Sequence, residues 1–311
     1  MPVVALSQVN CEELESVFHQ EIKCWQSELF WDYQPAIALI KKYIASGSLP
    51  GYAIRIPAGP VLGYCYYIIN EPVGYIGNMY VLSESADPAT YAELLNQILG
   101  KLESDKKIRR IEGQLFAFNC DLVPLFKDRQ FNVIKRHFLS RTIDSVNDSR
   151  QRPASPAAVR LVRWQEKFCN GAAEAICDSY HGSPDYSLCH DYQSRQGCTR
   201  FLRNLVDNPG CGIFSPETSL VALDSNEIVC GVLMASTIDP GTGMIPQISV
   251  RRSHQERGIG SLLLKTYFRE AGKHGIERVT LSVSGMNHRA HQLYLRLGFD
   301  RIRDFHAFTR P

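Results

Sequence analysis

The sequence of 311 residues predicts a mixed α/β fold that occurs twice along the chain. Three observations support this prediction. In residues 243–275 a short apolar strand leads through a glycine-containing turn into an amphipathic helix. Residues 279–310 then read as a strand, a helix and a last apolar segment, and the first half repeats this order at a constant offset. Strands that alternate with helices are typical of α/β sheets.

The first half is expected to begin with one or two helices, followed by a meander of strands. Residues 74–82, "GYIGNMYVL", read as a strand, and residues 93–104, "ELLNQILGKLES", as the helix after it. A further strand is expected at 111–116, with a helix and a final strand behind it. The longest apolar run, residues 61–69, is shorter than a bilayer-spanning helix, so no membrane insertion is expected.

The second half contains the clearest strand-to-helix turn. The apolar residues in 245–250 fit a short buried strand, and a helical spacing begins at Leu262 and ends at Gly275, which is placed as a C-terminal cap. Gly258 and Gly260 lie between the two, where the helix begins. The first N–H groups of a helix have no intrahelical acceptor and carry partial positive charge, so this turn is suited to binding phosphate.

Of three common phosphate-binding loops, the residues present exclude two. A Walker loop needs Gly-Lys-Ser/Thr, which the chain lacks, and a dinucleotide-binding turn needs a third glycine where this chain has Leu263. The remaining pattern resembles the Gln/Arg-x-x-Gly-x-Gly/Ala pyrophosphate loop of the GNAT acetyltransferase superfamily, which binds acyl-coenzyme A (acyl-CoA). The resemblance implies a cofactor-binding loop made of Gln255, Glu256, Arg257, Gly258, Ile259, Gly260 and Ser261.

A second motif follows about 30 residues later. Asn287, Ala290 and Tyr294 are spaced three and four residues apart, so they share one face of the predicted helix. The pattern Asn-x-x-Ala-x-x-Leu-Tyr-x-x-x-Gly-Phe is similar to the second half of the GNAT core. In that family the Asn helps to hold the pantetheine, the Ala leaves room for it and the Tyr is the general acid. The resemblance gives these roles to Asn287, Ala290 and Tyr294.

The resemblance also implies how the acyl group would be handled. Backbone groups of Ile248, Ser249 and Val250 would lie along the pantetheine. An N–H near Ile248 or Ser249 would polarise the thioester carbonyl, a contact that can contribute about 3 kcal/mol. A phenol ordinarily has a pKa near 10 and stays protonated at neutral pH, so Tyr294 can protonate the leaving thiolate.

The sequence leaves the general base open. Gln247 and Ser249 occupy the strand on which many family members carry a carboxylate. The first half of the chain or a chain of water molecules could supply the base instead. The candidate side chains in the second half are His254, His181, Asp185, His190 and Asp191.

An offset of 168 residues aligns the two halves without a gap over some 70 residues, and Asn287 then falls on Asn119. The other site positions differ: Gly258 and Gly260 correspond to Thr90 and Ala92, Arg257 to Ala89, Ala290 to Leu122 and Tyr294 to Phe126. We therefore predict two tandem GNAT domains. A degenerate domain over 1–146 keeps the fold without binding the cofactor, a linker follows over 147–157, and 158–311 form the catalytic domain.

The composition excludes several other classes of protein. A hydrophobic content of 44% indicates a globular chain, and a net charge of +2 gives no support for broad nucleic-acid binding. The first residues lack the charged start and apolar core of a signal peptide, so we expect a cytoplasmic protein whose ten cysteines are reduced. No metal is expected. The His and Cys residues that come nearest to a zinc-binding set match no standard zinc spacing: His181, Cys189, His190 and Cys198.

The predicted activity is direct transfer of an acetyl group from acetyl-CoA to a primary amine of a small molecule or peptide. The acceptor and the oligomeric state are not encoded in any motif. Tandem GNAT proteins also include mycothiol-synthase-like enzymes and aminoacyl-tRNA-dependent transferases, of which the latter usually lack an intact coenzyme A loop. A non-catalytic acyl-CoA-binding sensor or interaction module is the alternative function.

Overall fold

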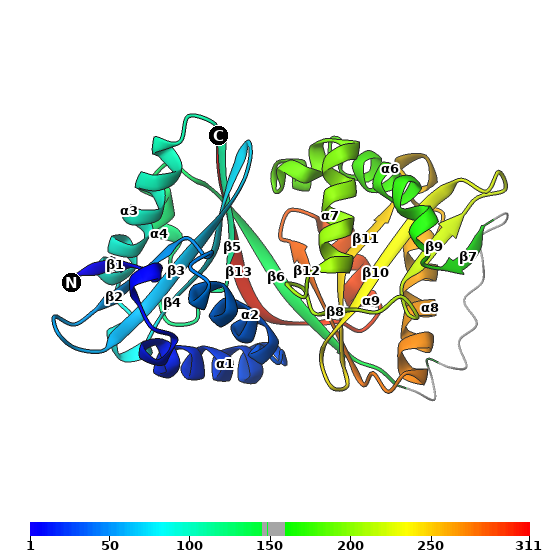
Figure 1. Ribbon diagram of the computed structural model, residues 1–311. Helices are drawn as coiled ribbons and strands as arrows, with labels where there is room; N and C mark the ends of the chain where they lie inside the picture. Colours follow the sequence, from blue (N-terminus) through cyan, green and yellow to red (C-terminus); the bar gives the residue numbers. More distant parts are fainter. Residues whose placement is uncertain (145–147, 149–158) are drawn as a thin grey trace. The chain divides into compact units, whose positions relative to one another are not determined.

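A computed structural model describes residues 1–144, 148 and 159–311, so the predicted linker at 147–157 lies outside the described residues except for Asp148. The chain divides into two compact units. The first contains residues 1–136 and 304–311, and the second contains residues 137–303. In each unit, helices cover both faces of a mixed sheet (Figure 1).

The sheet of the first unit has the strand order β1-β2-β3-β4-β5-β13, in which β4 and β5 are parallel. Helices α3 and α4 cover one face of this sheet, and α1 and α2 cover the other (Figure 1). The strands are β1 (Val3–Ala5), β2 (Gly51–Arg55), β3 (Val61–Asn70), β4 (Val73–Val81), β5 (Arg110–Leu115) and β13 (Asp300–Arg310). The helices are α1 (Glu15–Leu29), α2 (Gln34–Ala45), α3 (Pro88–Ser104) and α4 (Val123–Lys127).

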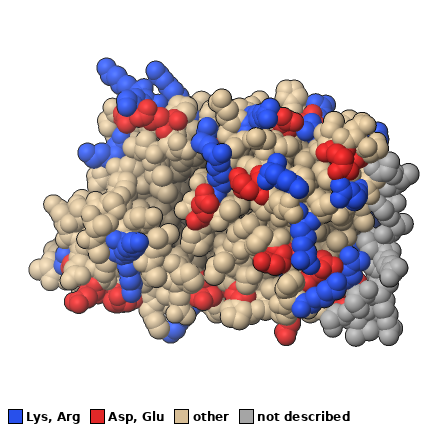
Figure 2. Space-filling model, turned by 45° about the vertical axis from the view of Figure 1, so that its right-hand side comes forward, with Lys and Arg blue, Asp and Glu red and all other residues tan. Residues whose placement is uncertain are grey.

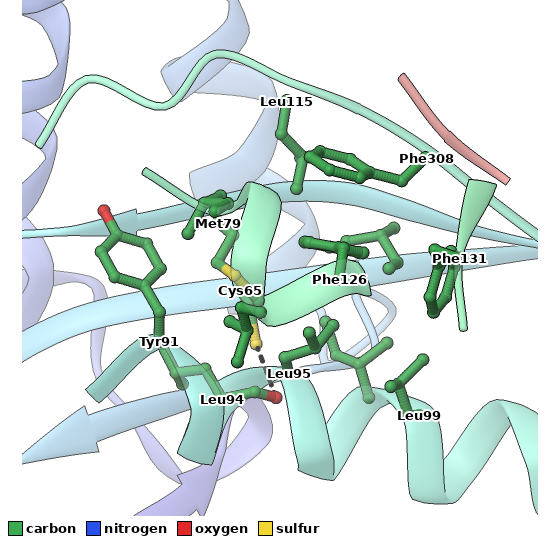
Figure 3. Close-up of a cluster of buried hydrophobic side chains, with 14 of the residues drawn as sticks. Cys65, Met79, Tyr91, Leu94, Leu95, Leu99, Leu115, Phe126, Phe131 and Phe308 are labelled. Atoms are coloured by element: carbon green, nitrogen blue, oxygen red, sulfur yellow. Dashed lines mark hydrogen bonds between the residues drawn. The ribbon is translucent and has the colours of Figure 1, made fainter. Parts of the chain in front are cut away.

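Successive side chains of β3 point to opposite faces of this sheet. The Cys65 thiol lies 3.8 Å from the carbonyl oxygen of Leu94 in α3, whereas the Tyr64 hydroxyl donates to Glu21 of α1 at 2.7 Å. Figure 3 shows the apolar layer on the α3 side, where Phe126 of α4 packs against Phe308 of β13. Their ring centroids are 3.8 Å apart.

The sheet of the second unit has the order β6-β12-β11-β10-β9-β7, and β8 pairs with β10. Helices α8 and α9 pack on one face and α6 on the other, with α7 packed against α6 (Figure 1). The strands are β6 (Asn132–Thr142), β7 (Arg160–Arg163), β8 (Ile213–Phe214), β9 (Leu220–Leu223), β10 (Val229–Asp239), β11 (Thr242–Val250) and β12 (Arg278–Ser284). The helices are α6 (Cys169–Tyr180), α7 (Arg195–Asp207), α8 (Ile259–Lys273) and α9 (His288–Arg296).

The last strand of each half completes the sheet of the other half. β13 pairs antiparallel with β5, with His306 opposite Leu115, and β6 lies beside β12. Beyond β6, the N–H of Ile143 donates to the carbonyl of Glu277 at 2.8 Å. The two compact units therefore differ at their ends from the predicted domains, 1–146 and 158–311, which stay a prediction. The difference arises because the edges of β5 and β12 each pair with the strand that the other half supplies.

The bounds of the elements recur at the offset found in the sequence. β3 and β10 begin at Val61 and Val229, and β5 and β12 begin at Arg110 and Arg278. β6 covers 132–142 and β13 covers 300–310, which is a shift of 168 at both ends. Because β6 and β13 are equivalent in the repeat, the sequence pattern alone does not reveal which sheet each one joins.

Two surface properties bear on possible partners. Among the described residues, no helix combines the length and apolarity that crossing a bilayer requires. On the face drawn in Figure 2, acidic and basic side chains are interspersed and do not form a large patch of one sign.

The ten cysteines, all of which are described, form no disulfide.

Candidate functional site

The strands β11 and β12 separate at their carboxyl ends. Their parallel ladder runs from Thr242 opposite Arg278 to Ile245 opposite Leu281 and stops there. Both strands are described throughout, and they continue beyond the ladder to residues 250 and 284. We call this gap in the ladder the opening; it lies at the carboxyl edge of the sheet, the edge where open α/β sheets bind ligands.

The alternation of hydrogen bonds shows which backbone groups of β11 face this opening. The N–H of Arg251 donates to the carbonyl of Cys230, so its antiparallel pair with β10 is hydrogen-bonded. Two residues earlier, Ser249 has the same orientation, whereas Ile248 and Val250 direct their backbone groups to the opposite edge. Of the two N–H groups that the sequence left open, that of Ile248 therefore faces the opening, and the backbone of Ser249 does not.

The polar side chains of β11 on the α6 face bond to one another and to α6. Ser249 is 6% exposed, and its hydroxyl accepts hydrogen bonds from Ser179 at 2.9 Å and from Gln247 at 2.7 Å. Tyr180 donates to the carbonyl oxygen of the Gln247 side chain at 3.4 Å. These bonds satisfy buried polar groups and hold α6 against the strand. This part of β11 contains no Asp or Glu, so the strand itself supplies no carboxylate base.

Between β11 and α8 the chain reverses through a strained turn. The 3₁₀ helix η7 (Arg252–His254) is followed by Glu256 and Gly258, which both have left-handed backbone conformations, with φ of 64° and 81°. A left-handed glutamate costs roughly 1 kcal/mol or more, and such strain often marks a functional turn. No side chain of the described residues caps α8, and its first turn contains no acidic residue. The helix N-terminus is therefore open to an anion.

Three side chains hold the turn in place. The Gln255 amide donates to the carbonyl of Val250 at 3.0 Å and accepts from Arg289 of α9 at 3.0 Å. Arg289 also lies 3.3 Å from the Glu256 carboxylate, and the Asp178 carboxylate of α6 accepts from the N–H of Arg252 at 2.7 Å. Sequence reasoning missed Asp178 and Arg289, because these contacts join residues 74 and 34 positions apart and no motif marks them.

The other predicted loop residues surround the start of α8. Ile259 is 1% exposed and packs in the core, while Arg257 is exposed and Ser261 is half-buried. A Cβ atom added to Gly260 would meet only the Leu293 side chain, at 3.4 Å, which is an ordinary contact. Folding alone therefore does not require glycine at 260, although close approach of a ligand to this backbone would.

The second predicted motif forms the start of α9. Asn287 is the N-cap: its side-chain oxygen accepts from the N–H of Ala290 at 3.2 Å, and its amide nitrogen donates to the Asp185 carboxylate at 3.0 Å. Ala290 is partly buried against the core. Tyr294 is 6% exposed, and its ring packs edge-on against Phe299 at 5.8 Å.

Among the candidate bases, the structure connects one to the predicted site residues. Asp185 lies in the 3₁₀ helix η5 (Pro184–Ser187) and contacts Asn287. Asp191 bonds to Arg200 at 2.6 Å, and the His254 ring lies 2.9 Å from Ser253 and 3.7 Å from Asp224. His181 is exposed and His190 is half-buried. Within the described residues, no group of three or more His, Cys, Asp or Glu side chains could hold a metal ion.

The first unit differs at the equivalent helix N-terminus. Asp87 caps α3, and one carboxylate oxygen accepts from the N–H groups of Ala89 at 2.8 Å and Thr90 at 3.0 Å. The Thr90 hydroxyl donates to the other oxygen at 2.8 Å. The backbone bond from Thr90 is the largest of several hydrogen bonds that lower the pKa of Asp87, so the carboxylate stays ionised where a phosphate would otherwise sit.

The remaining equivalent positions of the first unit are filled with apolar side chains. Leu122 and Phe126, which align with Ala290 and Tyr294, are 1% and 0% exposed. Figure 3 shows Phe126 enclosed by the core of this unit, and its ring lies edge-on to Phe131 at 5.1 Å. The phenol of the second unit thus has a packed hydrocarbon ring as its counterpart.

Comparisons with known proteins agree with the fold. The GCN5-related N-acetyltransferase from Sphaerobacter thermophilus superposes with a TM-score of 0.70 at 15% identity, covering 99% of this chain and 95% of that one. A tandem GNAT protein from the clavulanic acid biosynthesis pathway gives 0.57 at 14% identity, covering 84% and 82%. A GNAT-family acetyltransferase from Colwellia psychrerythraea gives 0.53 at 12% identity, covering 99% of both chains. No curated protein matches the sequence significantly.

These similarities confirm the predicted fold class, a mixed α/β architecture with two GNAT-like folds. The model of the acetyltransferase (GNAT) family matches residues 184–299, which include the parting strands, the turn before α8 and the N-terminus of α9. The second half of the chain therefore contains a region that matches the acetyltransferase (GNAT) family, and the chain as a whole shares the fold of the solved GNAT structures.

Proposed function

We propose that the chain is an N-acyltransferase that uses acetyl-CoA and acts on primary amines, with one working site in the second unit. The observation that carries this proposal is the uncapped N-terminus of α8 beside the opening between β11 and β12. An anionic cofactor with a long, narrow arm fits this combination of a phosphate-binding turn and an unpaired strand edge.

The residues present fit the pyrophosphate end of acetyl-CoA. The N–H groups at the start of α8, at Gly260 and Ser261, would donate to phosphate oxygens, and Arg257 would add a positive charge beside them. Gln255 and Arg289 hold the turn in the required shape and do not themselves need to touch the cofactor. Binding energy at this end would orient the thioester at the other end.

The residues at the opening fit the chemical step. The N–H of Ile248 would donate to the thioester carbonyl and stabilise the oxyanion that develops as the amine attacks. Tyr294 would then donate its phenolic proton to the departing thiolate. Asn287 would shape the opening by capping α9 and holding Asp185, which is a more indirect role than family resemblance implies.

The first unit would keep the fold without binding the cofactor. Its helix N-terminus already holds the carboxylate of Asp87, and a phosphate in the same place would meet a negative charge and would lack hydrogen-bond donors. The cytoplasmic location and the limits of the two domains in solution stay predictions.

The direct test is turnover by the full-length protein. Acetyl-CoA is incubated with a panel of small primary amines and peptides with free amino groups, and release of coenzyme A thiol is followed together with mass spectrometry of the acceptor. We expect acetylation of at least one class of primary amine. Tight binding of acetyl-CoA without transfer to any acceptor would instead support the alternative of an acyl-CoA-binding sensor.

A further inference from the structure

Three buried oxygen atoms near the opening find no hydrogen-bond partner among the described residues: Asp185 Oδ1, Ser183 Oγ and Ser284 Oγ. Asp185 is 6% exposed and Ser284 is fully buried. A buried polar atom without a partner destabilises the folded protein, and more so when the group is charged. Such atoms are rare in folded proteins, and a group of them indicates a ligand or ordered water.

Asn287 connects these atoms to the site. Its backbone N–H donates to the carbonyl of Ser284 at 2.9 Å, and its side-chain amide donates to Asp185 Oδ2 at 3.0 Å. Ser284 is the last residue of β12, the strand that parts from β11, and Ser183 is two residues before Asp185. Asp185 and the end of β12 therefore meet at Asn287, at the carboxyl edge of the sheet and beside the N-terminus of α9.

We propose that Asp185, with Ser183 and Ser284, binds the protonated primary amine of the acceptor, and that Asp185 takes its first proton. This inference rests on the proposed N-acyltransferase activity. A primary ammonium group has one positive charge and three N–H donors, which matches one carboxylate oxygen and two hydroxyl oxygens. A neutral alcohol lacks the positive charge, and a quaternary ammonium group lacks N–H donors.

The proton and electron balance is complete without a further reactant. The ammonium gives one proton to the Asp185 carboxylate, and the neutral amine uses its lone pair to form the C–N bond to the thioester carbon. The C–S bond then breaks, and the thiolate takes the proton of Tyr294. The new amide nitrogen loses its second proton, which restores the phenol, and Asp185 releases its proton to solvent.

The test compares Asp185→Asn with Asp191→Asn in the full-length protein. Asp191 is equally buried at 6% and belongs to the neighbouring 3₁₀ helix η6 (His190–Gln193), but its carboxylate is paired with Arg200. In Asp185→Asn we expect kcat/KM for an alkyl primary amine to fall by about 10²–10⁴, with acetyl-CoA affinity unchanged. Asp191→Asn should lower the melting temperature but keep kcat/KM within about threefold at a temperature where it stays folded.

Two further readouts separate a catalytic role from a structural one. Asp185→Asn keeps an oxygen for Asn287 and removes a buried carboxylate, so its melting temperature should equal or exceed that of the wild type. Its defect should also nearly vanish with a nucleophile that is neutral at neutral pH, such as methoxyamine. Ser284→Ala removes an atom without a protein partner, so it should raise the KM for the amine and leave the fold intact.

The possible failures are distinguishable. A wild-type protein that acetylates no amine would overturn the proposed function itself. A wild type that acetylates amines while Asp185→Asn retains its kcat/KM would overturn only the assignment of Asp185, and would leave water as the partner of the unpartnered oxygens. An equal loss with the alkylamine and with methoxyamine would contradict proton removal by Asp185.

Discussion

Replacement of Gly260 by valine tests whether a ligand approaches the backbone at the start of α8. The nearest neighbour of an added Cβ is Leu293 at 3.4 Å, so the folded protein has room for the first carbon. A branched side chain would, however, stand in front of the N–H groups of Gly260 and Ser261. Charge-assisted hydrogen bonds contribute about 1.5–3 kcal/mol each, so loss of two would weaken acetyl-CoA binding by about 10²–10⁴-fold.

The same helix offers a matched control. Gly272 lies near the other end of α8, and a Cβ added there would also meet one side-chain atom, of Ile143, at 3.4 Å. Gly272→Val introduces the same side chain with the same nearest distance, but far along the helix from the proposed phosphate site. Gly260→Ala forms a graded intermediate, because the resemblance to the Gly/Ala position of the family implies that alanine is tolerated.

Isothermal titration with acetyl-CoA provides the assay, and thermal melting provides the check on folding. We expect Gly260→Val to lose measurable affinity, and Gly260→Ala and Gly272→Val to bind within about threefold of the wild type. All three should melt near the wild-type temperature. Unchanged affinity in Gly260→Val, or an equal loss in Gly272→Val, would show that the turn before α8 is not the pyrophosphate site.

The remaining predictions concern three other side chains. Tyr294→Phe should lower kcat by about 10²–10⁴ with little change in acetyl-CoA affinity; near-normal turnover would mean that solvent protonates the thiolate. Arg289→Ala should weaken acetyl-CoA binding by about tenfold by loosening the turn at Gln255, and an unchanged titration would show that the turn is rigid without it. Burial raises the pKa of Glu21 from 4.5 to about 7, so the stability of the first unit should fall as pH rises through this window, by about 3 kcal/mol in all. Urea unfolding should show this fall in the wild type and not in Glu21→Gln, and equal slopes would contradict it.

Much of the fold could be predicted from local patterns. The strand before residue 250, the helix after Gly258 and the cap at Gly275 follow from periodicity and backbone preference, and Gly258 and Gly275 adopt the left-handed conformation that favours glycine. The offset of 168 residues between the two halves also holds for the strand bounds, because the same apolar spacing produces the same elements in each half. Exchange of the last strands could not be predicted, since β6 and β13 have equivalent positions and only long-range pairing decides their sheets.

The site could be predicted only where a motif carries it. The turn at 255–261 and the N-terminus of α9 had sequence signals, whereas Asp178 and Arg289 act through contacts between distant segments. Asp185 was one candidate base among several, and burial together with its contact to Asn287 distinguishes it. The cap formed by Asp87 could have been predicted, because an aspartate followed by proline is typical of a helix start. Only the structure shows that this carboxylate binds the N–H groups that correspond to the phosphate-binding turn of the second unit.

The stoichiometry of acetyl-CoA binding tests most directly whether the two GNAT-like folds have divided into one working and one silent site. Titration of the full-length protein should saturate at one acetyl-CoA per chain, and Gly260→Val should abolish that binding without revealing another. Saturation at two per chain, or a binding event that survives in Gly260→Val, would contradict the assignment of the cofactor to the second unit alone.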